Sequence, residues 1–472
     1  MPNLRFILGA MLVALATPAQ AVYVNPEGLG QALIFPYYTV RSGEGGVFNT
    51  YLSIVNSSED DKALRVRFRE ARNGRAVASF NVYLGRGDVW AAALVPSTAG
   101  TRLVTIDQSC TDPALPASGL DFSAAGYSGD GGGDGLDRTR EGYVEVLEMA
   151  TLVGPSAFAM THTSSALPAY CDRLGAVSTA DLRSPTGGIS GTLTLINVAD
   201  GSDYSLNAEA LAGLSRSPFF RQGADAYPGL DAIEIERVSV VASKGVVYRS
   251  RWPRGIDAVS AALMRDSATG DYALDAVTQS RSEVFVAFPT RPMHVTATEA
   301  SAPFDRAGNW SPQCAGPRGE QIGVDYFNRA TSGAALTDGS GFGGLSGPPI
   351  AICSAAAAIP VGKGSASAGL TGSTIDGFPP STVSVRSTFD NGWIRIVGGG
   401  RGMTSLPDST RLDSASGTVT VGAHLIYGLP MVGFAIRSLR NGTLSCPGAA
   451  ACQGNYGSAF PMRYTRNIAP AP

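Results

Sequence analysis

Residues Leu64 to Leu84 read LRVRFREARNGRAVASFNVYL, and this stretch decides the fold. In its first half apolar residues alternate with arginines, and in its second half apolar residues alternate with polar or small ones. Alternation with a period of two is typical of a strand with one buried face. The Asn-Gly pair between the halves is a turn signal, so the sequence predicts a β-hairpin with one face in the core.

The apolar residues also predict the register of this hairpin. A two-residue turn at the Asn-Gly pair would place Phe68 opposite Ser79 and divide the apolar residues between two faces, which a buried face forbids. A three-residue loop, 72–74, with Gly74 in the left-handed region, brings them onto one face. The expected pairs are therefore Phe68 with Ala78, Val66 with Phe80, and Leu64 with Val82.

The composition favours an all-β protein and argues against a nucleic-acid partner. The 472 residues include 58 glycines and 29 prolines, which separate short apolar runs. A chain of this length predicts two or three domains. The net charge is −3, whereas nucleic-acid-binding domains are usually basic.

The first 21 residues have the features of a signal peptide. Arg5 precedes an apolar run, 6–16, and Ala19-Gln20-Ala21 is a small-x-small cleavage site. We therefore expect an exported mature chain from Val22, located in the periplasm, at the cell surface or outside the cell. No later stretch of about 18 apolar residues predicts a transmembrane segment.

Six cysteines follow the cleavage site, and an even number in an exported chain predicts three disulfides. Six cysteines allow 15 pairings. The expected pairing is sequential: Cys110–Cys171, Cys314–Cys353 and Cys446–Cys452.

The order of strand-like and irregular stretches predicts tandem β-sandwich domains of immunoglobulin-like type, with long disulfide-stapled loops and at most a few short helices. One such helix is expected at Asp257–Met264. The expected parts are a β-sandwich at 22–155, an irregular linker at 156–187, a second β-rich domain at 188–300, and Gly/Ala/Ser-rich loops with C-terminal strands at 301–472.

A weak internal repeat accompanies this pattern. The stretch from Gly191 to Leu211 is similar to the stretch from Asn49 to Phe68, with Leu52 matching Leu193 and Asn56 matching Asn197. Such self-similarity predicts a duplicated strand–turn–strand unit.

Several stretches resemble a family of exported bacterial proteins. They are RTREGYVEVLEM (138–149), DAVSAALMRDSATGDYALDA (257–276), SEVFVAFPTRPMHV (282–295), GLPMVGFAIRSLRNGT (428–443) and NYGSAFPMRYTRNI (455–468). The family consists of uncharacterised envelope or surface proteins. The resemblance implies export and supplies no catalytic residues.

A glycine-rich loop, SGDGGGDGLDRTRE at 128–141, is the first candidate site. Asp130, Asp134, Asp137 and Glu141 supply the oxygen ligands that calcium prefers. Their spacing differs from that of an EF-hand. The alternative is a solvated loop whose aspartates favour turns.

The arginines of the hairpin, Arg65, Arg67 and Arg69, are the second candidate site. An exposed row of guanidinium groups could bind an acidic polysaccharide or another acidic partner. The alternative is a solvated strand face that discourages edge-to-edge aggregation.

Signals for an enzyme are weak. His162, His294 and His424 have no metal-binding spacing, and no serine lies in a G-x-S-x-G motif. Aromatic residues could form a platform for a sugar, although such rings more often fill a core. They are Tyr37, Tyr38, Tyr51, Trp90, Trp252 and Trp310.

We therefore expect a non-enzymatic structural protein of the bacterial envelope or surface, which assembles with itself or with other surface proteins. The alternative is a secreted module that binds a glycan or an acidic polymer. A secreted hydrolase is a third possibility, and no cofactor other than calcium is expected.

Overall fold

In the computed structural model, the described residues are 20–43, 45–163, 167–225, 229–311, 319–329, 344–346, 349–363, 369–375, 383–446 and 449–471. The protein is mostly β, with 49% strand and 9% helix. The strands form several sheets that are almost entirely antiparallel. The predicted all-β class is therefore confirmed at this level, and helices are few and short.

Sheet 1 lies at the centre of the first half of the chain and has the order β1-β15-β2-β11-β5-β6-β9, with β12 paired to β11. Its strands are Tyr23–Val24 (β1), Ala32–Thr39 (β2), Asp61–Glu70 (β5), Ala76–Leu84 (β6), Thr111–Asp112 (β9), Glu141–Leu152 (β11), Leu182–Arg183 (β12) and Glu209–Ala212 (β15).

Sheet 2 has the order β10-β8-β7-β4-β13-β14, with β3 paired to β4. Its strands are Ser42–Gly43 (β3), Gly46–Asn56 (β4), Val89–Ser97 (β7), Gly100–Val104 (β8), Leu120–Asp121 (β10), Ile189–Asn197 (β13) and Ser202–Asn207 (β14).

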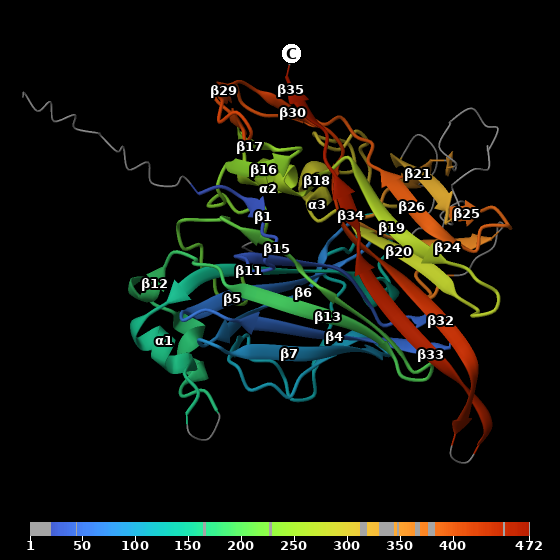
Figure 1. The fold of residues 1–472 in the computed structure, drawn as a ribbon. Helices are drawn as coiled ribbons and strands as arrows, with labels where there is room; N and C mark the ends of the chain where they lie inside the picture. The colour runs from blue at the N-terminus through green and yellow to red at the C-terminus, as the bar shows by residue number, and fades with distance from the viewer. Residues whose placement is uncertain are drawn as a thin grey trace, which may run out of the picture.

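The two sheets pack face to face, and one apolar core fills the space between them. Phe68 and Phe80 of the hairpin contribute from sheet 1, and Trp90 and Leu193 contribute from sheet 2. Figure 1 shows these layers as the blue and green strands of the lower part. We call residues 22–212 the two-sheet body.

The β5–β6 hairpin has the predicted register. Phe68 pairs with Ala78, Val66 with Phe80, and Leu64 with Val82. Gly74 has a φ of +66°, as expected for a left-handed loop residue. The predicted three-residue loop is wrong: the ladder shifts beyond Phe68 so that Arg69 pairs with Ala76 and Val77 forms a bulge. The N–H of Glu70 then donates to the carbonyl of Arg75, which leaves four residues, 71–74, in the loop.

Strands of the predicted second domain pair with those of the predicted first. β13 pairs with β4, and β15 pairs with β2, so residues 189–212 complete both sheets of the two-sheet body. The repeat noted in the sequence lies here: Leu52 faces Leu193 across the two antiparallel strands, and the matched Asn56 and Asn197 lie at opposite ends of the pair. The two repeated segments differ in where the next strand goes. β5, which follows β4, joins sheet 1, whereas β14, which follows β13, stays beside it in sheet 2.

A third layer covers the outer face of sheet 1. It contains α2 and the stretch between β15 and β16, which share a second apolar core with Ile34, Leu147 and Met149. This layer explains why every residue of β2, β5 and β11 is buried.

The helices of the described structure are Gly154–Met160 (α1), Gly255–Leu263 (α2), Arg291–His294 (α3), and the 3-10 helices Leu136–Arg140 (η1), Cys171–Ala176 (η2) and Thr179–Asp181 (η3).

Helix α2 confirms the one helix expected from the sequence, although it begins two residues earlier. Asp257 is the third residue of the helix, not its cap. Its carboxylate accepts the main-chain N–H of Arg254, the N-cap residue, at 3.1 Å.

The second half of the chain contains two further packed sheets, which enclose a third apolar core. Sheet 3 consists of Arg281–Ala287 (β20), Ala356–Lys363 (β24), Val383–Val385 (β25), Val432–Cys446 (β32) and Ala449–Pro461 (β33). Sheet 4 consists of Ser267–Ala273 (β19), Glu320–Asn328 (β21), Gly344–Ser346 (β22), Ile350–Ile352 (β23), Asn391–Val397 (β26) and Arg463–Thr465 (β34).

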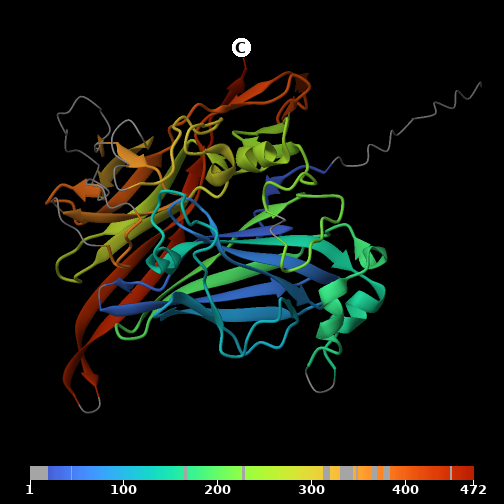
Figure 2. The ribbon, with the colours of Figure 1, turned by 180° about the vertical axis from the view of Figure 1, so that it is seen from behind.

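Sheet 3 also packs on the two-sheet body through its other face. Phe285 stacks on Tyr37 with ring centroids 4.3 Å apart and on Phe434 at 4.9 Å. Figure 2 shows from behind how sheet 3 and the long β32–β33 hairpin lie along one side of the body. Because these rings belong to the core of the body, the two halves share buried apolar surface.

Three small sheets complete the fold around and above α2, in the upper part of Figure 1. The first consists of Val238–Ser243 (β16), Val246–Arg251 (β17), Thr410–Asp413 (β28) and Val419–Val421 (β29); the second of Met264–Arg265 (β18) and Leu429–Pro430 (β31); the third of Met403–Thr404 (β27), His424–Ile426 (β30) and Ile468–Pro470 (β35).

One predicted disulfide is confirmed. Cys110 and Cys171 are bonded, with Cα atoms 5.2 Å apart, and join the start of β9 to η2. Cys353 is also disulfide-bonded, but Cys314, its expected partner, lies outside the described residues. The side chains of Cys446 and Cys452 lie outside the description as well, so these two pairings stay predictions.

Candidate functional site

The acidic residues of the glycine-rich loop lie apart and contact arginines and main-chain groups. Asp130 binds Arg138 through two hydrogen bonds of 2.6 and 2.7 Å. Asp137 binds Arg41 at 2.9 Å, and Glu141 is also paired with Arg41. Asp134 accepts the main-chain N–H of Gly129 at 2.9 Å.

These pairings change how the loop is interpreted. Among the described residues, no group of three or more His, Cys, Asp or Glu side chains is arranged to hold a metal. Burial would raise the pKa of Asp130, but hydrogen bonds from Arg138 and Asn73 lower it below its ordinary value. Three of the four carboxylates, those of Asp130, Asp137 and Glu141, are thus paired with arginines within the fold, and calcium binding at this loop stays a prediction.

Glu70 fixes the tip of the hairpin to this loop. Its carboxylate accepts two hydrogen bonds of 3.0 Å from Arg138, and both side chains are buried. It also accepts the main-chain N–H groups of Arg72, Asn73 and Arg75. A bidentate guanidinium–carboxylate pair is rigid, so this cluster holds the loop in place and is structural.

Glu141 joins the two halves of the molecule. Its carboxylate accepts hydrogen bonds from Tyr37 at 2.9 Å and from Ser373 at 2.6 Å. It also accepts the N–H and the hydroxyl of Thr374, each at 3.0 Å. A residue expected to bind calcium therefore ties β11 to a segment more than 200 residues away.

The hairpin arginines face away from the core, as predicted, but they are not exposed to solvent. Arg65 donates to the carbonyls of Gln222 and Gly223 at 2.6 and 2.9 Å. Arg69 lies 2.7 Å from Glu145. The expected exposure is wrong because the third layer, built from residues far along the chain, covers the row.

Two of the three histidines are buried among hydroxyl groups. The ring of His294 lies 2.8 Å from Ser260 and 3.1 Å from Ser301. Burial and the nearby Arg254 lower the pKa of His294 to about 4, so the ring is neutral at physiological pH. Ser260 is fully buried in α2, and no substrate can reach it.

The other histidines have similarly ordinary surroundings. The ring of His424 lies 3.4 Å from the hydroxyl of Ser250 and contacts Tyr248 edge-on. His162 lies at the surface, 4.0 Å from Asp88. Among the residues that the structure describes, neither lies beside both a nucleophile and a third orienting group, the arrangement that nucleophilic catalysis uses.

The aromatic residues proposed as a sugar platform do not share a surface. Tyr37, Tyr38 and Trp90 are in the core of the two-sheet body, and Trp252 is in the core of the third layer. Trp310 is buried beneath Arg72, whose guanidinium lies 4.0 Å from the ring. Only Tyr51 among the six is exposed.

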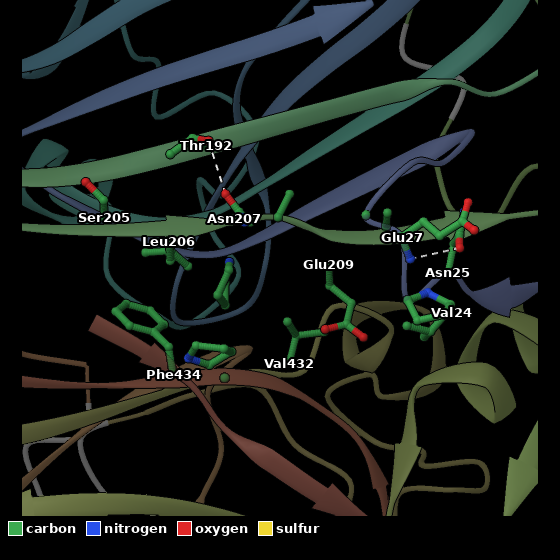
Figure 3. Close-up of a pocket in the computed structure, with 17 residues that line it drawn as sticks. Val24, Asn25, Glu27, Thr192, Ser205, Leu206, Asn207, Glu209, Val432 and Phe434 are labelled. Atoms are coloured by element: carbon green, nitrogen blue, oxygen red, sulfur yellow. Dashed lines mark hydrogen bonds between the residues drawn. The ribbon is translucent and has the colours of Figure 1, made fainter. Parts of the chain in front are cut away.

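A cleft of about 450 Å³ lies between the two-sheet body and the β32–β33 hairpin (Figure 3). Its floor contains Leu206, Val432 and Phe434, and its polar groups come from the N-terminal segment and from β13, β14 and β15. Thr192 donates to Asn207 at 3.2 Å, as the dashed line in Figure 3 shows. The arrangement suits a ligand with hydroxyl groups and one apolar face.

The acids of this cleft are Glu27, in the N-terminal segment, and Glu209, in β15. Glu209 is paired with the buried Arg265 at 3.1 Å. No pattern in the sequence indicates this cleft, because its walls come from segments that are separated by more than 400 residues and contain ordinary residue types.

The edge of the β16-β17-β28-β29 sheet exposes apolar side chains to solvent. Leu412 faces Val419 across the β28–β29 pair, and Thr410 faces Val421. Val419 is 62% exposed and Val421 is 67% exposed. Such residues on an edge strand are a template for pairing with another chain.

Comparisons with known proteins give no relative for this chain. No family model matches it, and no similar curated protein or solved structure is found. Within the described part of the chain, no helix is long and apolar enough to cross a membrane.

Proposed function

We propose that this chain is an exported, non-enzymatic protein of the bacterial envelope or surface that associates with a second copy of itself through the free edge of β29. The immunoglobulin-like identity of the two-sheet body belongs to this proposal; two packed antiparallel sheets support it only at the coarser level.

Export is supported by the disulfide and by the place where the fold begins. Disulfides persist mainly in oxidising compartments, and Cys110–Cys171 is one. Cleavage after Ala21 would leave Val22 at the start of the mature chain. The N–H of Val22 donates to the carbonyl of Val238 at 2.7 Å, so the first residue of the expected mature chain is already part of the fold.

The hydrogen bonds around β29 carry the proposal for self-association. The N–H of Asp413 donates to Thr418, and the N–H of Gly422 donates to Ser409. Because hydrogen-bonded pairs alternate along an antiparallel ladder, the main-chain groups of Val419 and Val421 point away from β28. They are available to another strand.

A second β29 is the partner that these groups fit best. Two copies of 419–421, related by a two-fold axis at Thr420, would place Val419 of one copy opposite Val421 of the other. Both valines would then lie on one continuous apolar face together with Leu412, and the interface would be the same on both copies. Self-complementarity of this kind favours a dimer of this chain over an unrelated partner.

The test is the oligomeric state of residues 22–472 and of the variant Val421→Pro, measured by sedimentation velocity over a range of concentrations. Proline removes an N–H that the folded monomer does not use, so the variant should stay folded and become monomeric. Val421→Thr keeps the N–H and the branched side chain and should still associate. A monomeric wild-type protein, or association that survives Val421→Pro, would contradict the proposal.

The cleft of Figure 3 favours a second candidate function, a module that binds a glycan. Hydroxyl and amide groups of Thr192, Ser205 and Asn207 lie beside the ring of Phe434, and sugars present both hydroxyl groups and apolar faces. A glycan array probed with the wild-type protein and Asn207→Ala tests this. Binding that is lost in the variant supports it, and an array without any bound glycan contradicts it.

A further inference from the structure

Two arginines at the end of α2 share a single carboxylate. Arg265 and Arg466 both donate to the carbonyl of Ala262, at 3.0 and 2.8 Å. Glu209 pairs with Arg265 at 3.1 Å. The side chain of Arg265 is only 4% exposed, and its Nε has no hydrogen-bond partner among the described residues.

The two positive charges are therefore not fully compensated. Burial and the adjacent Arg265 lower the pKa of Arg466, and Glu209 only partly offsets them. Carbonyl groups at a helix C-terminus attract cations, which explains why both guanidinium groups are held here. They do not supply the second full negative charge that two buried arginines require.

A pocket of about 450 Å³ opens beside these arginines. It is lined by Ala242, Ser243, Lys244, Arg265, Tyr464, Thr465 and Arg466. The lining thus contains three positive side chains, three hydroxyl groups and no Asp or Glu. Glu209, the acid paired with Arg265, lines the cleft of Figure 3 and not this pocket.

Lys244 completes the pocket from a strained position. It is exposed, and it occupies the first place of the two-residue turn between β16 and β17 with a φ of +49°, followed by Gly245 at +78°. Turns of this kind usually have Asn, Asp or Gly at that place, because left-handed backbone is unfavourable for a side chain such as lysine. The turn places the ammonium group at a pocket that is already positive.

We propose that this pocket binds an oxyanion of the phosphate or sulfate type. The Nε and Nη2 of Arg466 donate to the carbonyls of Met264 and Ala262, which leaves Nη1 to donate to an oxygen of such a group, and Lys244 adds a mobile point charge. The hydroxyl of Thr465 can accept from Ser267 at 2.6 Å and donate to a further oxygen, whereas that of Ser243 donates to the carbonyl of Arg466 at 3.4 Å. The volume exceeds that of one phosphate ion, so a phosphate or sulfate ester of a larger molecule fits as well as the free ion.

The test is calorimetric titration of residues 22–472 with inorganic phosphate and with sulfate, at constant ionic strength set with chloride. The wild-type protein should bind both oxyanions. Lys244→Ala should weaken binding about tenfold, the equivalent of one charged contact, and Arg466→Gln should abolish it. Arg463 is an exposed residue at the start of β34, three residues before Arg466 and outside the pocket, so Arg463→Gln should bind like the wild type.

Thermal unfolding of each variant separates loss of binding from loss of folding. If Arg466→Gln does not fold, Lys244→Ala decides, because its exposed side chain is not part of any core. Failure of the wild-type protein to bind phosphate or sulfate overturns the proposal, as does an equal loss in Arg463→Gln and Lys244→Ala.

Two further titrations distinguish the source of the oxyanion. Glycerol 3-phosphate represents a soluble phosphate ester, and vesicles of phosphatidylglycerol represent a lipid headgroup, with phosphatidylcholine vesicles as the control. Competition of inorganic phosphate with only one of these identifies the natural form of the ligand. Competition with neither assigns the pocket to the free ion.

Discussion

The ammonium group of Lys62 lies 2.8 Å from the carboxylate of Glu148, and neither side chain is exposed. The pair joins β5 to β11 inside sheet 1. Glu148 also accepts the main-chain N–H groups of Thr186 and Gly187 at 2.9 and 2.7 Å. The pair therefore anchors the segment that leads into β13, the strand with which the chain returns to sheet 2.

We expect Lys62→Met to lower the free energy of unfolding by about 3–5 kcal/mol, because it leaves the Glu148 carboxylate buried without its counter-ion. The double variant Lys62→Met/Glu148→Gln should recover part of this loss, since the unpaired charge is then gone. Urea denaturation of both variants gives the measurement.

Lys363→Met is the matched control for this prediction. Lys363 is paired with Asp390, but both side chains are partly exposed. Exposed pairs contribute about 0–1 kcal/mol, so this variant should be close to the wild type. A loss in Lys62→Met as small as that of the control would show that the buried pair is not needed.

The hairpin tip is the subject of the second prediction. Gly74 and Gly87 have nearly the same φ, +66° and +68°, but a Cβ atom at Gly74 would lie 2.4 Å from Pro292 and 2.9 Å from the hydroxyl of Tyr143. At Gly87 it would meet nothing within 4 Å. Gly87→Ala should cost about 1–2 kcal/mol for the left-handed backbone, and Gly74→Ala about 1–3 kcal/mol more for the overlap.

Thermal or urea unfolding of the two alanine variants checks this directly. The cost of a left-handed alanine is common to both variants, so the difference between their losses of stability measures the steric overlap at Gly74 alone. Equal losses at the two positions would mean that the hairpin tip does not pack against the second half of the chain as described.

The register of this hairpin could be predicted because it depends on neighbours in the sequence. Alternating residues define the buried face, and a left-handed glycine sets the loop, so only one register keeps Val66 and Phe68 in the core. The bulge at Val77 could not be predicted, because it adapts the strand to packing partners that are remote in sequence.

The surroundings of charged residues could not be predicted for the same reason. Arg65 looked like a solvated residue because alternation shows which face a side chain is on but not what covers that face. Its cover, around Gln222 and Gly223, follows more than 150 residues later. Likewise, the aspartates of the glycine-rich loop have the right chemistry for calcium, and only the fold shows that Arg41 and Arg138 neutralise them.

The third prediction concerns the disulfide that joins the start of β9, at the edge of sheet 1, to η2. Cys110 and Cys171 are 61 residues apart, and closing a loop of that length in the unfolded chain corresponds to about 4 kcal/mol. We expect Cys110→Ala/Cys171→Ala to lower the free energy of unfolding by this amount in urea denaturation without reductant. A loss below about 1 kcal/mol would contradict the role given to this bond.

The single variant Cys110→Ala provides a further control. It leaves Cys171, which is exposed, as a free thiol. Iodoacetamide should therefore label this variant under native conditions and leave the wild-type protein unlabelled. Labelling of Cys171 in the wild type, located by peptide mapping, would show that the bond is not formed.

The last prediction concerns Glu283, which is buried where sheet 3 meets the two-sheet body. Its carboxylate accepts the N–H and the hydroxyl of Thr371, each at 3.0 Å. Burial raises the pKa of Glu283 to about 7 from an ordinary value of 4.5, and those hydrogen bonds only partly oppose the shift. Between pH 4.5 and 7 the folded protein therefore keeps a proton that the unfolded chain has lost.

The sign of the effect follows from this difference. Since the folded state binds more protons in that window, the free energy of unfolding falls as the pH rises from 4.5 to about 7, by on the order of 3 kcal/mol. His294, whose pKa is lowered to about 4, has the opposite effect between pH 4 and 6.5. The contribution of Glu283 must therefore be measured as a difference between two proteins that both retain this histidine.

Glu283→Gln is the appropriate comparison, because the amide oxygen can still accept the hydrogen bonds from Thr371. We expect the variant to be more stable than the wild type at pH 8 and to lose that advantage as the pH falls to 5, as measured by urea denaturation at several pH values. A difference between the two proteins that does not change with pH would show that Glu283 does not titrate in this range. The meeting point of the two halves would then not depend on its ionisation.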